Sequence, residues 1–245
     1  MKNSRLLWQW LSVSLVLLMS LATNVSAQST WDAIKDRGSI RVGVTEAPPW
    51  FSKNPATGEW GGLGSAIGKQ MAKEMDVEFE PVEVTWSTAI AALQANKIDV
   101  MFVLDVTPKR ALAINFPAQP LLYYALAILA DYDLNIKSWE DLNKSGPKIS
   151  VFRGTTMDTY VSARLNKAEI LRFPSNGESV AAFQPGRVNA VSLFHPPLIA
   201  MRKKIGRGQI VLPSPIRQSA SSAGVRMEAD KRWRDWVNTS IAYYY

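Results

Sequence analysis

The sequence contains no cysteine and one histidine, His195. Without thiols the protein has no disulfide, no thiolate nucleophile and no zinc–sulfur site. A single histidine cannot build a usual zinc site either. We therefore predict neither a metal nor a cofactor, and we expect packing alone to stabilise the folded chain.

After residue 27 the sequence lacks an apolar run long enough to span a membrane. Residues 1–27 themselves have the composition of a secretory signal peptide, with a positive start at Lys2 and Arg5, an apolar run over residues 6–21 and small residues at 25–27. A membrane anchor is the alternative, but polar residues interrupt the run, which is short for the ~20 residues that a helix needs to span a bilayer. We predict cleavage after residue 27 and a soluble periplasmic protein.

Dense clusters of one charge are also rare. The 28 Lys and Arg residues exceed the 21 Asp and Glu residues, for a formal net charge of +7, but they are scattered along the chain. The one basic run, at residues 202–207, falls at a predicted helix end, where cations interact favourably with the helix dipole. We therefore predict no nucleic-acid partner.

Apolar patterns of strand and helix alternate along the chain. Residues 39–44 alternate as a strand, residues 63–75 show helical spacing, and residues 98–103 are nearly continuously apolar, which is typical of a strand covered on both faces. A second set of strands and helices follows over residues 139–212. The apolar run at 121–130 suits an extended ribbon between two lobes. The sequence predicts an α/β fold.

Seven short motifs occur in a fixed order: Gly38-Ser39-Ile40-Arg41-Val42-Gly43-Val44, Pro48-Pro49-Trp50-Phe51, Gly58-Glu59-Trp60-Gly61-Gly62-Leu63, Asn96-Lys97-Ile98-Asp99-Val100, Thr107-Pro108-Lys109-Arg110, Gly154-Thr155-Thr156 and Gly186-Arg187-Val188-Asn189-Ala190-Val191. Each alone is weak evidence, but their order and spacing are specific. Together they resemble the family 3 extracellular solute-binding proteins, the polar amino-acid-binding group of ABC importers, over nearly the whole chain after the signal peptide.

This resemblance implies a type II periplasmic-binding-protein fold with two discontinuous lobes joined by two hinge strands. Lobe 1 is expected at 28–122 and 211–245, and lobe 2 at 123–210. The lobes are expected to close over a small ligand and to deliver it, as a monomer, to an inner-membrane ABC permease. Members of the family usually continue past residues 243–245 with a further short helix, so we expect either a truncated chain or a lobe completed differently.

Arg110 is the first candidate site residue, because in this family the arginine of the Thr-Pro-Lys-Arg motif binds the ligand carboxylate. A guanidinium matches a carboxylate bidentately and keeps its charge when desolvated. A surface ion pair is the alternative. Gly154, Thr155 and Thr156 lie at a predicted strand-to-helix junction, where free backbone amides favour an anion. A plain helix cap is the alternative there.

Trp50 or Phe51, in the proline-rich loop, is expected to form an aromatic wall for the ligand, although tryptophan and phenylalanine also serve as core residues. His195 is a further candidate contact, with a buried structural role as the alternative.

Two positions depart from the family pattern. Phe194 stands near the place where binders of α-amino acids usually have an aspartate for the ammonium group, and its ring offers only a cation–π face. Asp105 stands where a small hydroxyl residue is more common. Either Asp105 binds a ligand ammonium group or it pairs locally with Arg110, and the sequence leaves both open. Glu46 is a further candidate acid.

The predicted function is capture of an amino acid or related small carboxylate for import, without catalysis. A cyclohexadienyl-dehydratase-like enzyme is one alternative, since some proteins resembling this family are dehydratases and Asp105, Glu46 and His195 are possible acid–base groups. A ligand-sensing module is the other. No transmembrane segment or kinase domain follows in this sequence to favour it.

Overall fold

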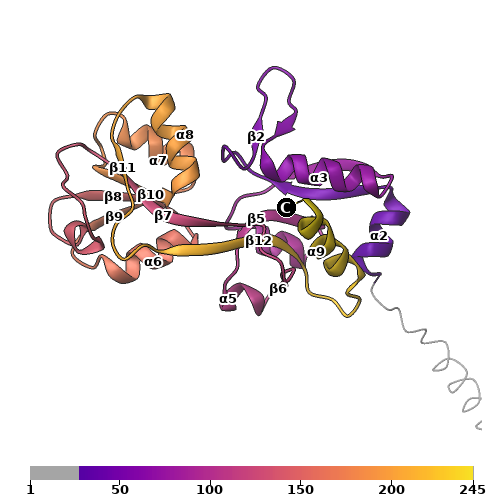
Figure 1. Ribbon diagram of the computed structural model, residues 1–245. Helices are drawn as coiled ribbons and strands as arrows, with labels where there is room; N and C mark the ends of the chain where they lie inside the picture. Colours follow the sequence, from indigo (N-terminus) through magenta and orange to yellow (C-terminus); the bar gives the residue numbers. More distant parts are fainter. Residues whose placement is uncertain (1–27, 245) are drawn as a thin grey trace, which may run out of the picture.

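The computed structural model describes residues 28–244. The predicted signal peptide, residues 1–27, lies outside the described residues. Two lobes lie side by side and are joined by two long strands (Figure 1). None of the described helices is long and apolar enough to cross a membrane.

Both lobes combine strands with helices. The first lobe contains α2 (Thr30–Arg37), β1 (Ser39–Val44), β2 (Ser52–Lys53), β3 (Trp60–Gly61), α3 (Leu63–Glu74), β4 (Glu78–Glu83), α4 (Ala89–Gln94), β5 (Val100–Asp105), α5 (Pro108–Ala111), β6 (Ile114–Asn115) and α9 (Arg232–Tyr244). The second lobe contains the 3-10 helix η1 (Trp139–Leu142), β8 (Lys148–Phe152), α6 (Thr156–Arg164), β9 (Glu169–Phe173), α7 (Asn176–Phe183), β10 (Ala190–Phe194), α8 (His195–Ile205) and β11 (Gln209–Val211). The connecting strands are β7 (Leu122–Ala130) and β12 (Gln218–Arg226).

The strands form one continuous hydrogen-bonded order, β4-β1-β5-β12-β7-β10-β8-β9. Pairing is parallel between β1 and β4, β1 and β5, β8 and β9, and β10 and β8. It is antiparallel where β12 and β7 join the lobes. The predicted α/β class is confirmed, with the antiparallel pairs added by the connecting strands.

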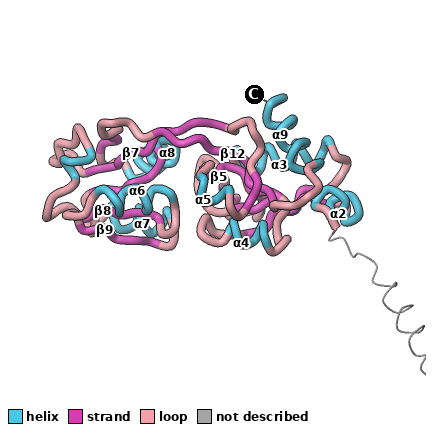
Figure 2. The backbone as a smooth tube through the Cα atoms, turned by 90° about the horizontal axis from the view of Figure 1, so that it is seen from below, coloured by secondary structure: helices cyan, strands magenta, loops and turns pink. Residues whose placement is uncertain are grey.

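Strand β7 belongs to both lobes. Leu122 to Ala125 pair with β12, whereas Leu126 to Ala130 pair with β10. The change of partner between Ala125 and Leu126 marks the point at which the chain passes from one sheet to the other. Figure 2 shows the two connecting strands running next to each other between the lobes.

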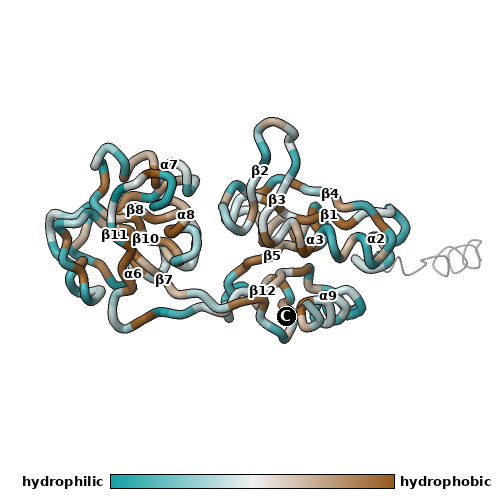
Figure 3. The backbone as a smooth tube through the Cα atoms, turned by 45° about the horizontal axis from the view of Figure 1, so that its top comes forward, coloured by the Kyte–Doolittle hydropathy of each residue, from teal (hydrophilic) through white to brown (hydrophobic). Residues whose placement is uncertain are grey.

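The apolar strands form the centre of each lobe (Figure 3). Helix α9 covers the first lobe through Trp233, which is fully buried and whose Nε1 donates a hydrogen bond to the Asp99 carbonyl oxygen at 2.9 Å. Trp236 stacks on Trp233 and meets Trp31 of α2 edge-on, with ring centroids 5.6 and 6.1 Å apart. The two ends of the described chain therefore pack against each other.

Capping residues that can be identified in the sequence determine where some helices begin and end. Ser29 caps α2 by accepting a hydrogen bond from the Asp32 amide, and Gly38 ends the helix in the left-handed conformation, φ 74°, which glycine adopts without steric cost. The strand expected at 98–103 begins two residues later, at Val100. The residue before it, Asp99, is a buried polar residue whose side chain makes hydrogen bonds.

The side chain of Asp99 is fully buried and joins β1 to β5. Its carboxylate accepts hydrogen bonds from the Arg41 amide at 2.7 Å, from Arg41 Nη2 at 2.7 Å and from Arg37 Nη2 at 2.5 Å. A buried carboxylate needs such partners because its desolvation is otherwise costly.

We expect Asp99→Ala to lower the free energy of unfolding by about 3 kcal/mol, because it leaves two partly buried guanidinium groups and one backbone amide without their acceptor. Glu83→Ala is the matched control, since Glu83 forms an exposed pair with Lys53, and it should cost less than about 1 kcal/mol. Urea denaturation measures both values. Equal losses in the two variants would contradict this role of Asp99.

Candidate functional site

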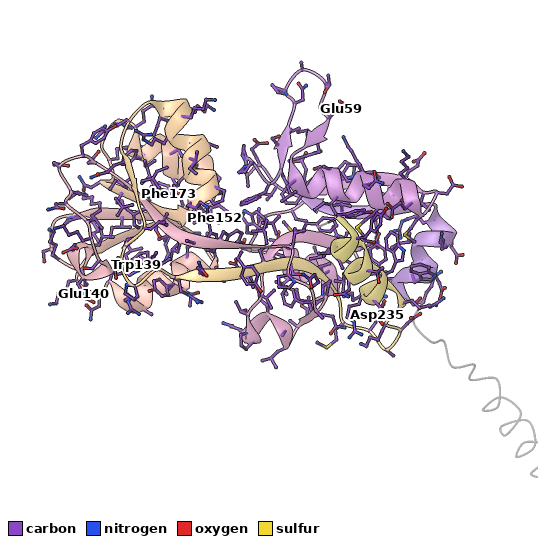
Figure 4. The ribbon with its side chains drawn as sticks, viewed as in Figure 1. Glu59, Trp139, Glu140, Phe152, Phe173 and Asp235 are labelled. Atoms are coloured by element: carbon purple, nitrogen blue, oxygen red, sulfur yellow. The ribbon has the colours of Figure 1, made fainter. Side chains whose placement is uncertain are left out.

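A small cavity of about 40 Å³, partly open to solvent, lies between the lobes. Its walls come from the loops that follow β1 and β4, from β5, α5 and β7, and from β8, α6, α7, β10 and α8. The lining residues are Trp50, Trp86, Val103, Asp105, Arg110, Tyr124, Phe152, Thr155, Met157, Asn176, Leu193, Phe194 and Pro197. In Figure 4, Phe152 is labelled on the side of its lobe that faces the other lobe.

Arg110 is held at the cavity by a short helix. Thr107 caps α5 by accepting a hydrogen bond from the Arg110 amide at 3.2 Å, and Pro108 occupies the first helical position. The guanidinium Nη1 donates to the Asp105 carbonyl oxygen at 3.1 Å. The side chain keeps an exposed fraction of 14%. Arg110 is therefore fixed by the end of β5 and remains accessible from the cavity.

Asp105 ends β5 and connects three elements. Its buried carboxylate accepts hydrogen bonds from the Tyr124 hydroxyl on β7 at 2.6 Å and from the Thr156 hydroxyl on α6. One carboxylate oxygen lies 3.8 Å from Arg110 Nη1. Of the two alternatives that the sequence leaves open, the structure has the local pair with Arg110.

Burial changes the titration of this group. Desolvation raises the pKa of the Asp105 carboxyl above its ordinary value of 3.8, against the opposing hydrogen bonds from Thr156 and Tyr124 and the charge of Arg110. Burial and then the negative charge of Asp105 raise the pKa of Tyr124 well above its ordinary value of 10.0. Tyr124 is therefore a neutral hydrogen-bond donor to Asp105.

The segment Gly154-Thr155-Thr156 forms the start of α6, as predicted. Most of its hydrogen bonds cap this helix. The Thr155 hydroxyl donates to the Phe152 carbonyl oxygen at 2.7 Å and caps the helix by accepting from the Asp158 amide at 3.3 Å. The Gly154 amide donates to the Asp158 carboxylate at 3.2 Å. Thr155 still lines the cavity, while Thr156 reaches across to Asp105.

Three aromatic rings form one wall of the cavity. Tyr124 lies between Phe194, at a centroid distance of 3.9 Å, and Trp50, at 5.8 Å. Phe51, the neighbour of Trp50, lies elsewhere: it is fully buried, and a Cβ on Gly64 would lie 2.3 Å from its ring. Of the two aromatic candidates in the loop, Trp50 lines the cavity and Phe51 is a core residue.

His195 and Glu46 lie outside the cavity lining. The His195 Nδ1 accepts a hydrogen bond from the Ala125 amide at 3.2 Å and so joins the start of α8 to the middle of β7. Glu46 is exposed and accepts from the Lys53 amide at 3.0 Å in the β2–β3 hairpin. Both contacts are structural.

Sequence reasoning missed Tyr124, Phe152 and Asn176 as lining residues. Tyr124 lies in the apolar run of β7, which is buried from Tyr124 to Ala130, so the local sequence does not single it out. Asn176 follows the Ser175 cap of α7, and its position at the cavity depends on how β9 and α7 fold back, which the local sequence does not encode.

Val103 lies in a bulge of β5. The register between β5 and β12 shifts between Ser222 and Gly224, and Val103 has a φ of 62°. This conformation is strained for a β-branched residue. The bulge brings Val103 into the cavity lining.

A second, larger hollow of about 620 Å³ adjoins the cavity and shares Arg110 and Thr155 with it. Lys109, Arg164 and Arg217 also line it. No acidic side chain is among the residues that line this second hollow within the described chain. Within residues 28–244 no three histidine or acidic side chains lie close enough together to hold a metal ion.

Two α/β lobes joined by a pair of strands, with a cavity between them, define a protein that encloses a small solute. Residues 40–244 match the family described as bacterial extracellular solute-binding proteins, family 3. The chain belongs to this family. The predicted family, fold and general function in solute binding are thus confirmed.

Individual relatives agree with this assignment. The L-arginine-binding protein of Pseudomonas aeruginosa is 32% identical over 72% of this chain and 68% of its own length. The ABC transporter glutamine-binding protein GlnH of Bacillus subtilis is 30% identical over 70% of this chain and 64% of its own length. The crystal structure of the ancestral amino-acid-binding protein AncCDT-1, a precursor of cyclohexadienyl dehydratase, is similar with a TM-score of 0.80 and 31% identity, covering 88% of this chain and 93% of that chain.

The raised pKa of Asp105 predicts a specific pH dependence of stability. Between pH 3.8 and the raised value, the folded protein binds more protons at this group than the unfolded chain does, so the free energy of unfolding falls as pH rises. We expect the free energy of unfolding of the wild type, relative to that of Asp105→Asn, to fall with rising pH by at most about 1.4 kcal/mol per pH unit. Urea denaturation of both proteins from pH 3.8 to 7 measures this difference. If this difference rises with pH instead, the charge of Arg110 outweighs desolvation and lowers the pKa of Asp105.

Proposed function

We propose that this protein is the periplasmic substrate-binding component of an ABC importer and binds an amino acid or related small carboxylate between its lobes. The names of its relatives support this, since they include an L-arginine-binding protein and an ABC transporter glutamine-binding protein. The partner is then an inner-membrane permease. We expect a monomer without a nucleic-acid partner.

The observation that carries this proposal is the placement of Arg110. A rigid guanidinium, held by the Asp105 carbonyl oxygen and still reachable from the cavity, is the group best suited to bind a carboxylate with two parallel hydrogen bonds. The opposite lobe supplies Thr155 and Thr156 at the start of α6, where the helix dipole favours negative charge.

Closure then involves both lobes. We propose that lobe 1 comprises 28–122 and 212–245 and that lobe 2 comprises 123–211, one residue further than predicted because β11 pairs with β7 in the second lobe. We propose that the lobes move about β7 and β12. Trp50 and Phe194 contact the body of the ligand. The hydrogen bond between Thr156 and Asp105 already joins the lobes. The ligand therefore binds in a cleft whose two sides are already in contact.

Replacing Arg110 tests the site directly. In a thermal-shift screen of amino acids and their keto and amide analogues, we expect a ligand that raises the melting temperature of the wild type to lose this effect with Arg110→Ala, because its carboxylate has no bidentate donor. We expect affinity to fall by about 10–100-fold. Arg234→Ala is the control, since Arg234 pairs only with the adjacent Asp235 at the surface. An unchanged dissociation constant in Arg110→Ala would remove Arg110 from the site.

A dehydratase is the second candidate, because one structural relative is described as a precursor of cyclohexadienyl dehydratase. Asp105 is also a buried carboxyl with a raised pKa beside a cavity, as general acid catalysis requires. We infer binding rather than catalysis, since both Asp105 oxygens already accept hydrogen bonds from Tyr124 and Thr156.

We expect no product when the protein is incubated with prephenate and the absorbance of phenylpyruvate is followed. The reason is that Tyr124, Thr156 and Arg110 already engage the Asp105 carboxyl group and hold it as part of the contact between the lobes. Turnover that disappears in Asp105→Asn but persists in Arg234→Ala would establish the enzyme instead.

A further inference from the structure

Positive charge dominates the space between the lobes. Arg110 lines both hollows, and Lys109, Arg164 and Arg217 line the larger one. Among the described residues that line either hollow, Asp105 is the one acid. Such a surface attracts anions and opposes the entry of cations.

The acid that lines the cavity is already engaged by neighbouring side chains. Each Asp105 oxygen accepts a hydrogen bond, one from Tyr124 and the other from Thr156, and Arg110 lies 3.8 Å away. At the end of β10, Phe194 presents a buried ring packed on Tyr124 at 3.9 Å. An ammonium group entering here would have to share this carboxylate with Tyr124, Thr156 and Arg110.

The remaining walls are apolar and largely aromatic. Trp50, Trp86, Phe152, Met157 and Leu193 all line the cavity. Surfaces of this type favour a flat apolar body, and to an ammonium group they offer the face of an aromatic ring, which compensates its desolvation less than a carboxylate does. Among the described residues that line this smaller cavity, Arg110 is the one cation. The cavity can therefore neutralise one ligand carboxylate.

Asn176 adds a polar contact of a different kind. It lines the cavity, and its exposed fraction is 7%. Buried amides are normally satisfied, and this one offers two donors and an acceptor. An uncharged oxygen of the ligand, such as a hydroxyl, would satisfy it.

We propose that the cleft selects a monocarboxylate that has a flat apolar body, lacks an α-ammonium group and carries an uncharged oxygen substituent bound by Asn176. This inference rests on the proposed function and specifies its ligand class. It separates the chain from its relative in Pseudomonas aeruginosa, which is named for L-arginine.

Matched ligands test the ammonium discrimination on the unmodified protein without its signal peptide. 3-Phenylpropanoate and L-phenylalanine share the ring and the carboxylate and differ in the ammonium group. By isothermal titration calorimetry, we expect 3-phenylpropanoate to bind at least about tenfold more tightly than L-phenylalanine, and L-arginine not to bind, because neither ammonium nor guanidinium finds a free acid. Tighter binding of either amino acid overturns the inference.

Two substitutions test the residues responsible. Phe194→Asp restores an acid to the wall and should reverse the preference toward L-phenylalanine. Asn176→Leu should abolish an approximately tenfold preference for hydroxyl-substituted phenylpropanoates over the unsubstituted acid, with Asn176→Ala as a second variant. Asn166→Leu, at an exposed position, is the control and should retain this preference. Unchanged preferences in folded Phe194→Asp and Asn176→Leu would contradict the assigned roles.

Arg110→Ala separates failure of this inference from failure of the proposed function. If an amino acid binds and the binding is lost in Arg110→Ala, the function stands and the ligand class is wrong. If 3-phenylpropanoate binds equally well to Arg110→Ala, the carboxylate site itself is wrong. If no ring-bearing carboxylate binds, the ligand class is overturned regardless of what other solute the protein binds.

Discussion

The hydrogen-bonded carboxylate of Asp105 is the interaction on which the geometry of the cleft depends. It joins the end of β5, the connecting strand β7 through Tyr124 and the second lobe through Thr156, and it lies beside Arg110. A buried carboxylate is stable only with such partners. The position of the guanidinium, the tilt of the aromatic wall and the contact between the lobes are thus coupled through one side chain.

The two connecting strands determine where the link between the lobes can bend. Because β7 pairs with β12 in its first half and with β10 and β11 in its second, rotation of one lobe relative to the other requires bending near Ala125. His195 accepts a hydrogen bond from the amide at that residue. A histidine that has no place in the cavity lining therefore contributes to the stiffness of the connection.

The sequence predicted many of the strands and helices, because strand periodicity and helix starts such as Thr107-Pro108 are local signals. Arg110 was selected through the resemblance to the family, and the structure places it at the cavity. It did not distinguish Trp50 from Phe51. These neighbours differ because the Ala47–Phe51 bridge turns Phe51 toward α3. Tyr124 and Asn176 reach the cavity through the pairing of β7 and the packing of α7. Such long-range placement cannot be derived from the residues around them.

The packing of α9 against α2 has a consequence for the order of folding. Strand β5 carries Asp105, and Trp233 of α9 closes the core behind it by donating to the Asp99 carbonyl oxygen. The first lobe therefore completes its core only when residues 232–244 have packed against residues 30–37. Helix α9 thus supports the strand that carries Asp105, although no residue of α9 lines the cavity.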